Sequence, residues 1–323
     1  MLALTELINR IASGRHGLPE ALCARQASYL QGLQQPDGGF PNRHGGSDPY
    51  YTAFGLGALA LLGRLDEQVS AGASGFLRQR LRQRLLPVEF IAAATSALLL
   101  HASRSDESLA ATLADLQQQA ASVLDPLRLP DGGYAKTARS SASSTYQTFL
   151  AISCKQLLGM AQDDLRPVAA FLCSRQRPDG GFAEVDHASS SGVNPTAAAV
   201  VLARTIQELA DAAKTEIPLP SLDPAARYLA AMQTPEGGLR ASALVPLADL
   251  LSTFTGLVAL ACLGAEESID RAAMQGYVAD LEHPAGGFCG SLWDRQPDCE
   301  YTFYALGTLA LLGGAGYTPH GLK

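Results

Sequence analysis

The chain has 323 residues, of which 47% are hydrophobic and 17% are charged, so it can form one large domain or two ordinary ones around a substantial core. Its 31 acidic and 24 basic residues give a formal net charge of −7, which argues against a general nucleic-acid footprint, because such a footprint needs many Lys and Arg. The apolar runs are too short to cross a bilayer. Six scattered cysteines without a CxxC pair favour a reduced, cytoplasmic compartment.

The first fifteen residues, MLALTELINRIASGR, predict an amphipathic helix. Glu6 lies within the apolar stretch, and no small-residue cleavage site is present. The segment therefore does not have the pattern of a secretion signal.

A turn motif with two glycines recurs five times along the rest of the chain. PDGGF begins at Pro36 and Pro178, PDGGY at Pro130, PEGGL at Pro235 and PAGGF at Pro284. These prolines lie 94, 48, 57 and 49 residues apart, and the first gap is close to twice the others. The spacing predicts six units of roughly fifty residues, with a degenerate second unit that has lost its turn around residues 79–103.

Each unit has the pattern of two helices joined by a polar loop. The first helix is amphipathic and ends at the proline, and the two glycines permit a turn with positive φ. The second helix is apolar nearly all round, so we expect it to be buried. Four of these apolar helices end in a glycine that is typical of a C-terminal cap: Gly63, Gly159, Gly264 and Gly313. No segment alternates as a strand does, so the chain is predicted to be all-α.

Six such hairpins predict a single domain over residues 1–323, an α/α toroid with six inner and six outer helices. The last unit, QPDCEYTFYALGTLALLG, most resembles the first, SDPYYTAFGLGALALLG, which favours closure of the ring. The polar end caps expected of an open solenoid are not seen.

These repeats resemble a known superfamily. PDGGF, a polar loop and a helix of the form T-x₃-L-x₂-L are similar to the repeats of protein prenyltransferase β-subunits and squalene-type terpene cyclases, over nearly the whole chain. Both are α/α toroids. The resemblance implies that the cavity of the ring holds an isoprenoid and that the chemistry lies at the mouth where the inner helices begin. We align these helices on a threonine near their start: Thr52, Thr95, Thr145, Thr196, Thr253 and Thr302.

The resemblance also implies where a metal would bind. Prenyltransferases take zinc ligands from D-x-C in the fifth repeat and from a His just before the Thr of the sixth. Here Asp249 is kept, but Leu251 replaces the Cys and Tyr301 replaces the His. Zinc requires about four donors, so we expect no zinc and no other cofactor. The alternative is a rebuilt site made from Asp249, Cys299 and a loop histidine such as His187.

Type II terpene cyclases carry an acid motif, D-x-D-D-T-A, before an inner helix. The sixth unit offers Asp298-Cys299-Glu300-Tyr301-Thr302, in which Glu300 takes the place of the acid. A buried carboxyl beside another is pushed toward its protonated form, as a proton donor to an alkene requires. We therefore name Glu300 as a candidate catalytic residue, together with Asp298 and Asp249. Helix capping is the structural alternative for these carboxyls.

Candidate substrate-binding residues lie in the same part of the units. An aromatic cage for a carbocation or a prenyl chain could form at the inner helix starts, with core packing as the alternative, from Tyr50, Tyr51, Tyr301, Phe303 and Tyr304. Three side chains are candidates for anion contacts: Arg43, His44 and Arg240. Arg240 is the only cation in a fifth-repeat loop where prenyltransferases carry several, which weakens the prediction of a diphosphate substrate.

The sequence thus predicts an isoprenoid-handling enzyme, either a cyclase with a non-standard acid or a prenyltransferase-like variant. Two alternatives are open. The first is a non-catalytic toroid that binds an isoprenoid or another long apolar molecule. The second is an interaction subunit that needs a partner, as prenyltransferase β-subunits need an α-subunit. Neither a nucleic-acid partner nor a membrane span is expected.

Overall fold

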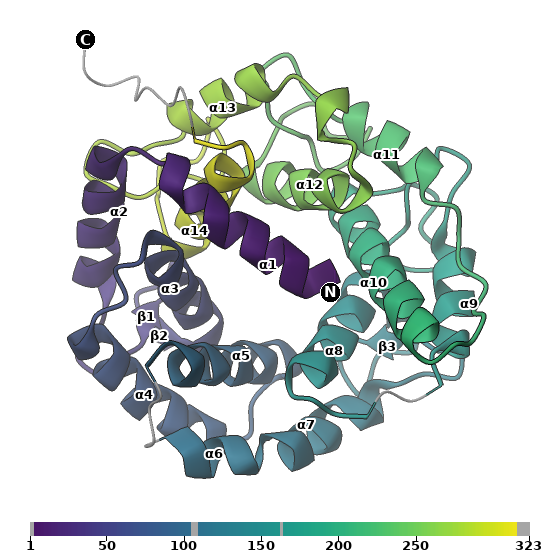
Figure 1. The fold of residues 1–323 in the computed structure, drawn as a ribbon, viewed down its shortest axis with the longest axis horizontal. Coiled ribbons are helices and arrows are strands. Elements are labelled where there is room, and N and C mark those ends of the chain that lie inside the picture. Colours follow the sequence, from purple (N-terminus) through teal and green to yellow (C-terminus); the bar gives the residue numbers. More distant parts are fainter. Residues whose placement is uncertain (1–2, 105–108, 162–163, 315–323) are drawn as a thin grey trace.

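The computed structural model describes residues 3–104, 109–161 and 164–314, which form a closed ring of six helical hairpins (Figure 1). The inner layer consists of α3 (Pro49–Leu62), α5 (Pro87–Arg104), α8 (Thr145–Leu157), α10 (Val193–Ala212), α12 (Leu250–Leu263) and α14 (Cys299–Leu311). The outer layer consists of α2 (Glu20–Leu33), α4 (Glu67–Leu81), α6 (Ala110–Ala114) with α7 (Leu116–Leu124), α9 (Arg166–Arg175), α11 (Asp223–Ala230) and α13 (Arg271–Asp280). Each inner helix packs on the next, and α14 packs on α3, so the predicted α/α toroid is confirmed.

The sequence predicts fully irregular loops after the Gly-Gly turns, but two of these loops contain a short pair of antiparallel strands. β1 (Phe40–Pro41) pairs with β2 (Ser47–Asp48), and β3 (Tyr134–Ala135) pairs with β4 (Ser143–Ser144). Each strand has only two residues. Their effect is to bring the aromatic residue of the Gly-Gly turn opposite the residue that precedes the inner helix. Among the described residues, no helix is long and apolar enough to cross a membrane.

The Gly-Gly turns pack on the outer helix of the following unit, which explains why they contain glycine. Gly38 has φ +88°, and a Cβ there would lie 2.0 Å from the carbonyl oxygen of Gly72 in α4. The last turn closes the circle, because a Cβ on Gly287 would lie 2.5 Å from the ring of Tyr29 in α2. The turns therefore lie at one end of the ring, where the inner helices begin. We call this the turn end.

A threonine fixes each loop to its inner helix. The hydroxyl of Thr52 donates to the Asp48 carbonyl at 2.7 Å and accepts from the Phe40 amide at 2.9 Å. In the third repeat this role belongs to Thr148, which accepts from the Tyr134 amide at 2.8 Å. Thr145, used in the sequence alignment, instead donates to the Ala183 carbonyl of the next loop. The third repeat is thus shifted by three residues from its predicted register.

Polar contacts between the first and last repeats hold the ring closed. The Arg43 guanidinium donates to Asp298 and to Asp294, both at 2.6 Å. On the outer layer, Arg25 Nε donates to Glu282 at 2.7 Å. These side chains lie 251 to 257 positions apart in the sequence, so they pair only because the ring closes.

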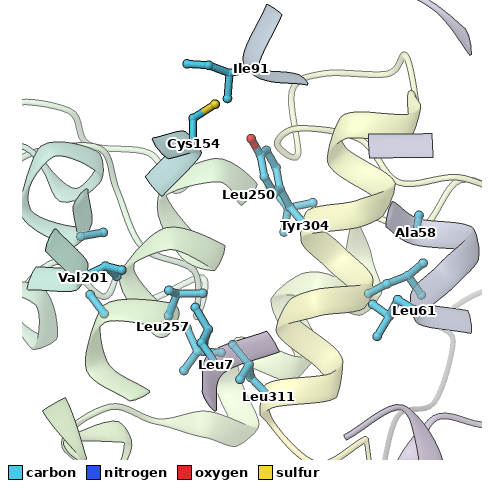
Figure 2. Close-up of a cluster of buried hydrophobic side chains, with 14 of the residues drawn as sticks. Leu7, Ala58, Leu61, Ile91, Cys154, Val201, Leu250, Leu257, Tyr304 and Leu311 are labelled. Carbon is cyan, nitrogen blue, oxygen red and sulfur yellow. The ribbon is translucent and has the colours of Figure 1, made fainter. Parts of the chain in front are cut away.

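The N-terminal helix α1 (Ala3–Gly14) is amphipathic, as predicted, and crosses the ring at the end opposite the turns (Figure 1). It packs on α14, α10 and α12. Leu7 lies among Leu257 and Leu311 in the core (Figure 2), and Arg10 donates to the Ala261 carbonyl at 3.0 Å. Because the inner helices end here, we call this the α1 end.

Candidate active site

A cavity of about 570 Å³ lies inside the ring on the side of α3, α5 and α8, with contributions from α1 and α14. None of the side chains that line it is charged. The few polar ones are hydroxyls, among them those of Tyr50, Thr95 and Tyr146. Such a cavity has the size and the apolar character of a small-molecule site.

The lining residues recur with the same spacing on three neighbouring helices, and this spacing gives the true register. The rows begin at Tyr50 on α3, Val88 on α5 and Tyr146 on α8, and each continues three, four and seven residues later. Val88 therefore holds in the second repeat the position that Tyr50 holds in the first. The alignment on Thr95 places Ala93 there instead, two residues before the threonine. The degenerate second unit has no Gly-Gly turn to fix the alignment, and Thr95 lies further along the helix.

Glu300 lies at the turn end of the ring in the first turn of α14. The hydroxyls of Tyr50 and Tyr304 both donate to its Oε1 atom, at 2.7 and 3.1 Å. Burial raises the pKa of Glu300 above its usual value; the hydrogen bond from Tyr50 opposes this, and the charge of Asp298 adds to it. Glu300 does not itself line the cavity, but Tyr50 does, so the carboxyl is one hydrogen bond away from the cavity.

Tyr146 is a site residue that the sequence alignment missed. It precedes Thr148 by two residues, as Tyr50 precedes Thr52 and Glu300 precedes Thr302. It lines the cavity, and burial raises its pKa to about 12, with a further contribution from the charge of Glu300. The signal that could have found it is the spacing from the threonine to the capping glycine, which is 11 residues for Thr148 and Gly159, as it is for Thr52 and Gly63.

The two candidate aspartates are helix N-caps. Asp298 accepts from the Tyr301 amide at 2.9 Å and pairs with Arg43. Asp249 accepts from the amide and the hydroxyl of Ser252, both at 2.7 Å. Burial raises the pKa of both carboxyls, and these hydrogen bonds oppose the shift. Neither aspartate lines the cavity.

The candidate cations do not gather at the cavity. Arg43 is engaged by its two aspartates and lies over the ring of Tyr301, 5.0 Å from the centroid. His44 is exposed on its loop. Arg240 is half-buried in the fifth-repeat loop, where its Nε atom is buried without a hydrogen-bond partner.

Of the candidate aromatic residues, Tyr50 and Phe303 line the cavity and Tyr304 stands behind them. Phe303 packs against Phe54 of α3 at 5.6 Å between ring centroids, and Phe54 packs against Tyr304 at 5.2 Å. We use the name aromatic wall for four residues: Phe54, Phe303, Tyr304 and Phe254 of α12. The other two candidates, Tyr51 and Tyr301, lie outside the cavity lining.

Residues 20–74 and 74–318 match the family model of the prenyltransferase alpha-alpha toroid domain. The chain belongs to this family. No curated protein matches the sequence significantly.

Solved structures of toroid proteins share the fold of this family member at low sequence identity. Protein geranylgeranyltransferase-I of Candida albicans, complexed with GGPP, superposes with a TM-score of 0.68 at 14% identity, over 92% of each chain. A variant of the type II terpene cyclase MstE from Scytonema, in complex with its substrate geranylgeranyl dihydroxybenzoate, superposes with a TM-score of 0.56 at 15% identity. That match covers 97% of this chain and all of the other. Such identities establish the toroid fold alone.

The residues of this toroid do not fit the zinc site that the family resemblance implies. Leu251 offers no donor atom, and Tyr301 lies under Arg43. Cys299 is buried and donates to the Tyr51 carbonyl at 3.2 Å. His187, the third member of the rebuilt site, is exposed. Within the described residues, no three His, Cys, Asp or Glu side chains are grouped as metal ligands, and the absence of zinc stays a prediction.

Proposed function

We propose that this chain is an isoprenoid-converting enzyme of the terpene cyclase kind, in which Glu300 supplies the proton that starts the reaction. One observation carries the proposal. A half-buried carboxyl with a raised pKa lies one hydrogen bond from an apolar cavity, at the end where the inner helices begin. Burial shifts Glu300 toward its protonated form, which is the form that general acid catalysis on an alkene requires.

The proton would reach the cavity through Tyr50. In the carboxylate form both phenols donate to Oε1, so Oε1 is the oxygen whose proton can reach the Tyr50 oxygen. A protonated Glu300 can instead donate to the Tyr50 oxygen, and the phenol proton then points into the cavity. As the alkene carbon takes the phenol proton, the Tyr50 oxygen takes that of Glu300, so the phenol is restored and Glu300 ends as carboxylate. In this scheme Glu300 is the acid and Tyr50 is the relay.

The rest of the cavity suits a cationic intermediate formed on a long apolar chain. Its uncharged lining excludes competing ionic groups. Phe54 and Phe303 of the aromatic wall line the cavity, and aromatic rings attract a carbocation by the same electrostatic effect that binds other cations. A substrate that fills the cavity displaces water, which would otherwise quench the cation.

Transfer of a prenyl group from a diphosphate is less well supported. A diphosphate normally requires several Arg or Lys donors, and Arg43 is already engaged by Asp294 and Asp298.

The test is to incubate the protein with squalene, geranylgeraniol and geranylgeranyl diphosphate and to identify products by gas chromatography with mass spectrometry. Glu300→Gln keeps the size of the side chain but cannot protonate an alkene, so turnover should fall roughly a hundredfold or more. Tyr50→Phe should lower turnover by a similar factor if the phenol is the relay. Equal turnover by wild type and Glu300→Gln would rule out the role of this acid.

A second candidate function is that of an interaction subunit, and an exposed apolar patch favours it. On two neighbouring loops at the turn end, Leu244 is 79% exposed and Trp293 is 75% exposed, with Val245, Leu247 and Leu292 beside them. Such patches mark protein interfaces. Native mass spectrometry of protein purified from its source at low salt would reveal a partner, and absence of turnover by the chain alone would then favour this reading.

A further inference from the structure

The residues that line the cavity differ in exposure along the axis of the ring. At the α1 end, Ile8 is 51% exposed and Leu157 is 43% exposed, and Ala12 is exposed as well. Among the described residues that line the cavity, no others are exposed. At the turn end, Tyr50 and Tyr146 are no more than partly exposed, and Tyr304 behind them is buried. The cavity therefore meets solvent at the end remote from Glu300.

Helix α1 covers this end only in part. Its packing partners are α14, α10 and α12, and Arg10 ties it to the end of α12 through the Ala261 carbonyl and an ion pair with Glu266. In Figure 1, α1 lies beside α14, α12 and α10 and leaves the ends of α3, α5 and α8 uncovered. Ile8 and Ala12 of α1 line the cavity together with Leu61 of α3 and Leu157 of α8.

We propose that the gap between α1 and the ends of α3 and α8, lined by Ile8, Ala12, Leu61 and Leu157, is the entrance for a linear apolar ligand, which enters apolar end first and keeps its polar end at the α1 end. This inference rests on the proposed function for the identity of the ligand as an isoprenoid. The entrance is wholly apolar, and so is the path beyond it, apart from hydroxyl groups. A polar leading end would lose its hydration along this path without gaining charged partners. A trailing polar group stays hydrated.

The entrance can be tested by measuring how fast a probe binds. The probe is the anthranilate ester of geranylgeraniol, whose fluorescence rises on transfer to an apolar site, followed by stopped flow. The double variant Ile8→Trp with Leu157→Trp narrows the gap. We expect the probe to associate with this variant about tenfold more slowly than with wild type. The matched control, Leu244→Trp with Leu292→Trp, places the same bulk on exposed leucines at the turn end and should bind at the wild-type rate.

Variants that widen the gap should have the opposite effect on the association rate. They also control for the possibility that substitution simply damages the packing of α1. Ile8→Ala with Leu157→Ala should bind at least as fast as wild type, with unchanged helical content by circular dichroism. Slower binding by both the Trp pair and the Ala pair would overturn the proposal, as would slower binding by the turn-end control alone. If wild type binds the probe and none of the three variant pairs changes the association rate, the assigned entrance is wrong and the proposed function still stands. No binding by wild type would overturn both.

The order of entry has its own test. Geranylgeraniol that carries the anthranilate at the chain end remote from its hydroxyl has no apolar end to lead with. We expect it to bind at least about tenfold more weakly than the ester probe, whose far end is bare hydrocarbon. Equal affinity for the two probes would overturn the order of entry.

Discussion

The fifth and sixth repeats begin their inner helices in the same way and differ where chemistry could occur. Asp249 caps α12 and Asp298 caps α14, and in both a threonine hydroxyl donates back to the aspartate carbonyl, at 2.7 and 2.6 Å. Two residues after the cap, however, the fifth repeat has Leu251 and the sixth has Glu300. In these two repeats the capping residues thus build the same helix start, and the position between cap and threonine is free to carry function.

The largest expected difference between the two repeats is in turnover. Glu300→Gln should lower product formation roughly a hundredfold, because it removes the proposed acid. Asp249→Asn should leave turnover within about twofold, because Asn caps a helix nearly as well as Asp. Both variants are assayed at saturating substrate by gas chromatography. A large loss in Asp249→Asn with none in Glu300→Gln would transfer the acid role to the fifth repeat.

Removing the shared threonine should destabilise both repeats alike. Thr302→Val and Thr253→Val each leave a buried amide, that of Phe288 or Leu239, without its acceptor. We expect each to lower the free energy of unfolding by about 2 kcal/mol, measured by urea denaturation. Serine at the same positions keeps the hydroxyl and should restore most of this loss.

The two caps should respond differently to loss of charge. Asp298→Asn keeps the cap but weakens the pair with Arg43, so we expect a loss of about 1–2 kcal/mol in the free energy of unfolding. Asp249→Asn breaks no ion pair within the described residues and should cost less than about 0.5 kcal/mol. Equal losses in the two variants would show that Arg43 adds nothing to closure of the ring.

The smallest expected effect is in the dependence of stability on pH. The pKa of Glu300 in the folded chain is raised above its ordinary value of 4.5, so the folded chain holds this proton more tightly than the unfolded chain. Its contribution to stability is therefore greatest below pH 4.5 and is lost as pH rises through the folded-state pKa. Glu300→Gln should gain in Tm relative to wild type between pH 4 and pH 8, whereas Leu251→Gln should show no such trend.

The repeated pattern of turn, loop and helix in the sequence was enough to predict the ring, its closure and its caps. Gly63 and Gly264 end their helices in the left-handed conformation, and Asp48 caps α3. The register inside the third repeat was predicted wrongly. Thr145 and Thr148 both stand near the start of α8, and alignment on the first of them missed that Thr148, like Thr52, Thr253 and Thr302, stands 11 residues before the capping glycine; the contact with Tyr134 confirms Thr148.

The candidate site was predictable to a lesser degree. Tyr50, Glu300 and Tyr304 come together as the alignment of helix starts suggested. The pairing of Arg43 with Asp298 was not predictable, because it depends on side-chain reach across the closed ring. The exposure of the cavity at the α1 end was not predictable either, because it depends on the side on which α1 packs.

Closure of the ring also sets the timing of folding. The Arg43–Asp298 pair joins residues 255 positions apart. One side of α3 is covered only after α14 has been made and packs against it. At a ribosomal speed of about 5–20 residues per second, the first hairpin is made tens of seconds before its last neighbour. During that interval an apolar flank of α3 is exposed to other chains. Synthesis, more than equilibrium stability, is therefore the stage at which this fold is most open to aggregation, and slowing translation in its second half should lower the soluble yield.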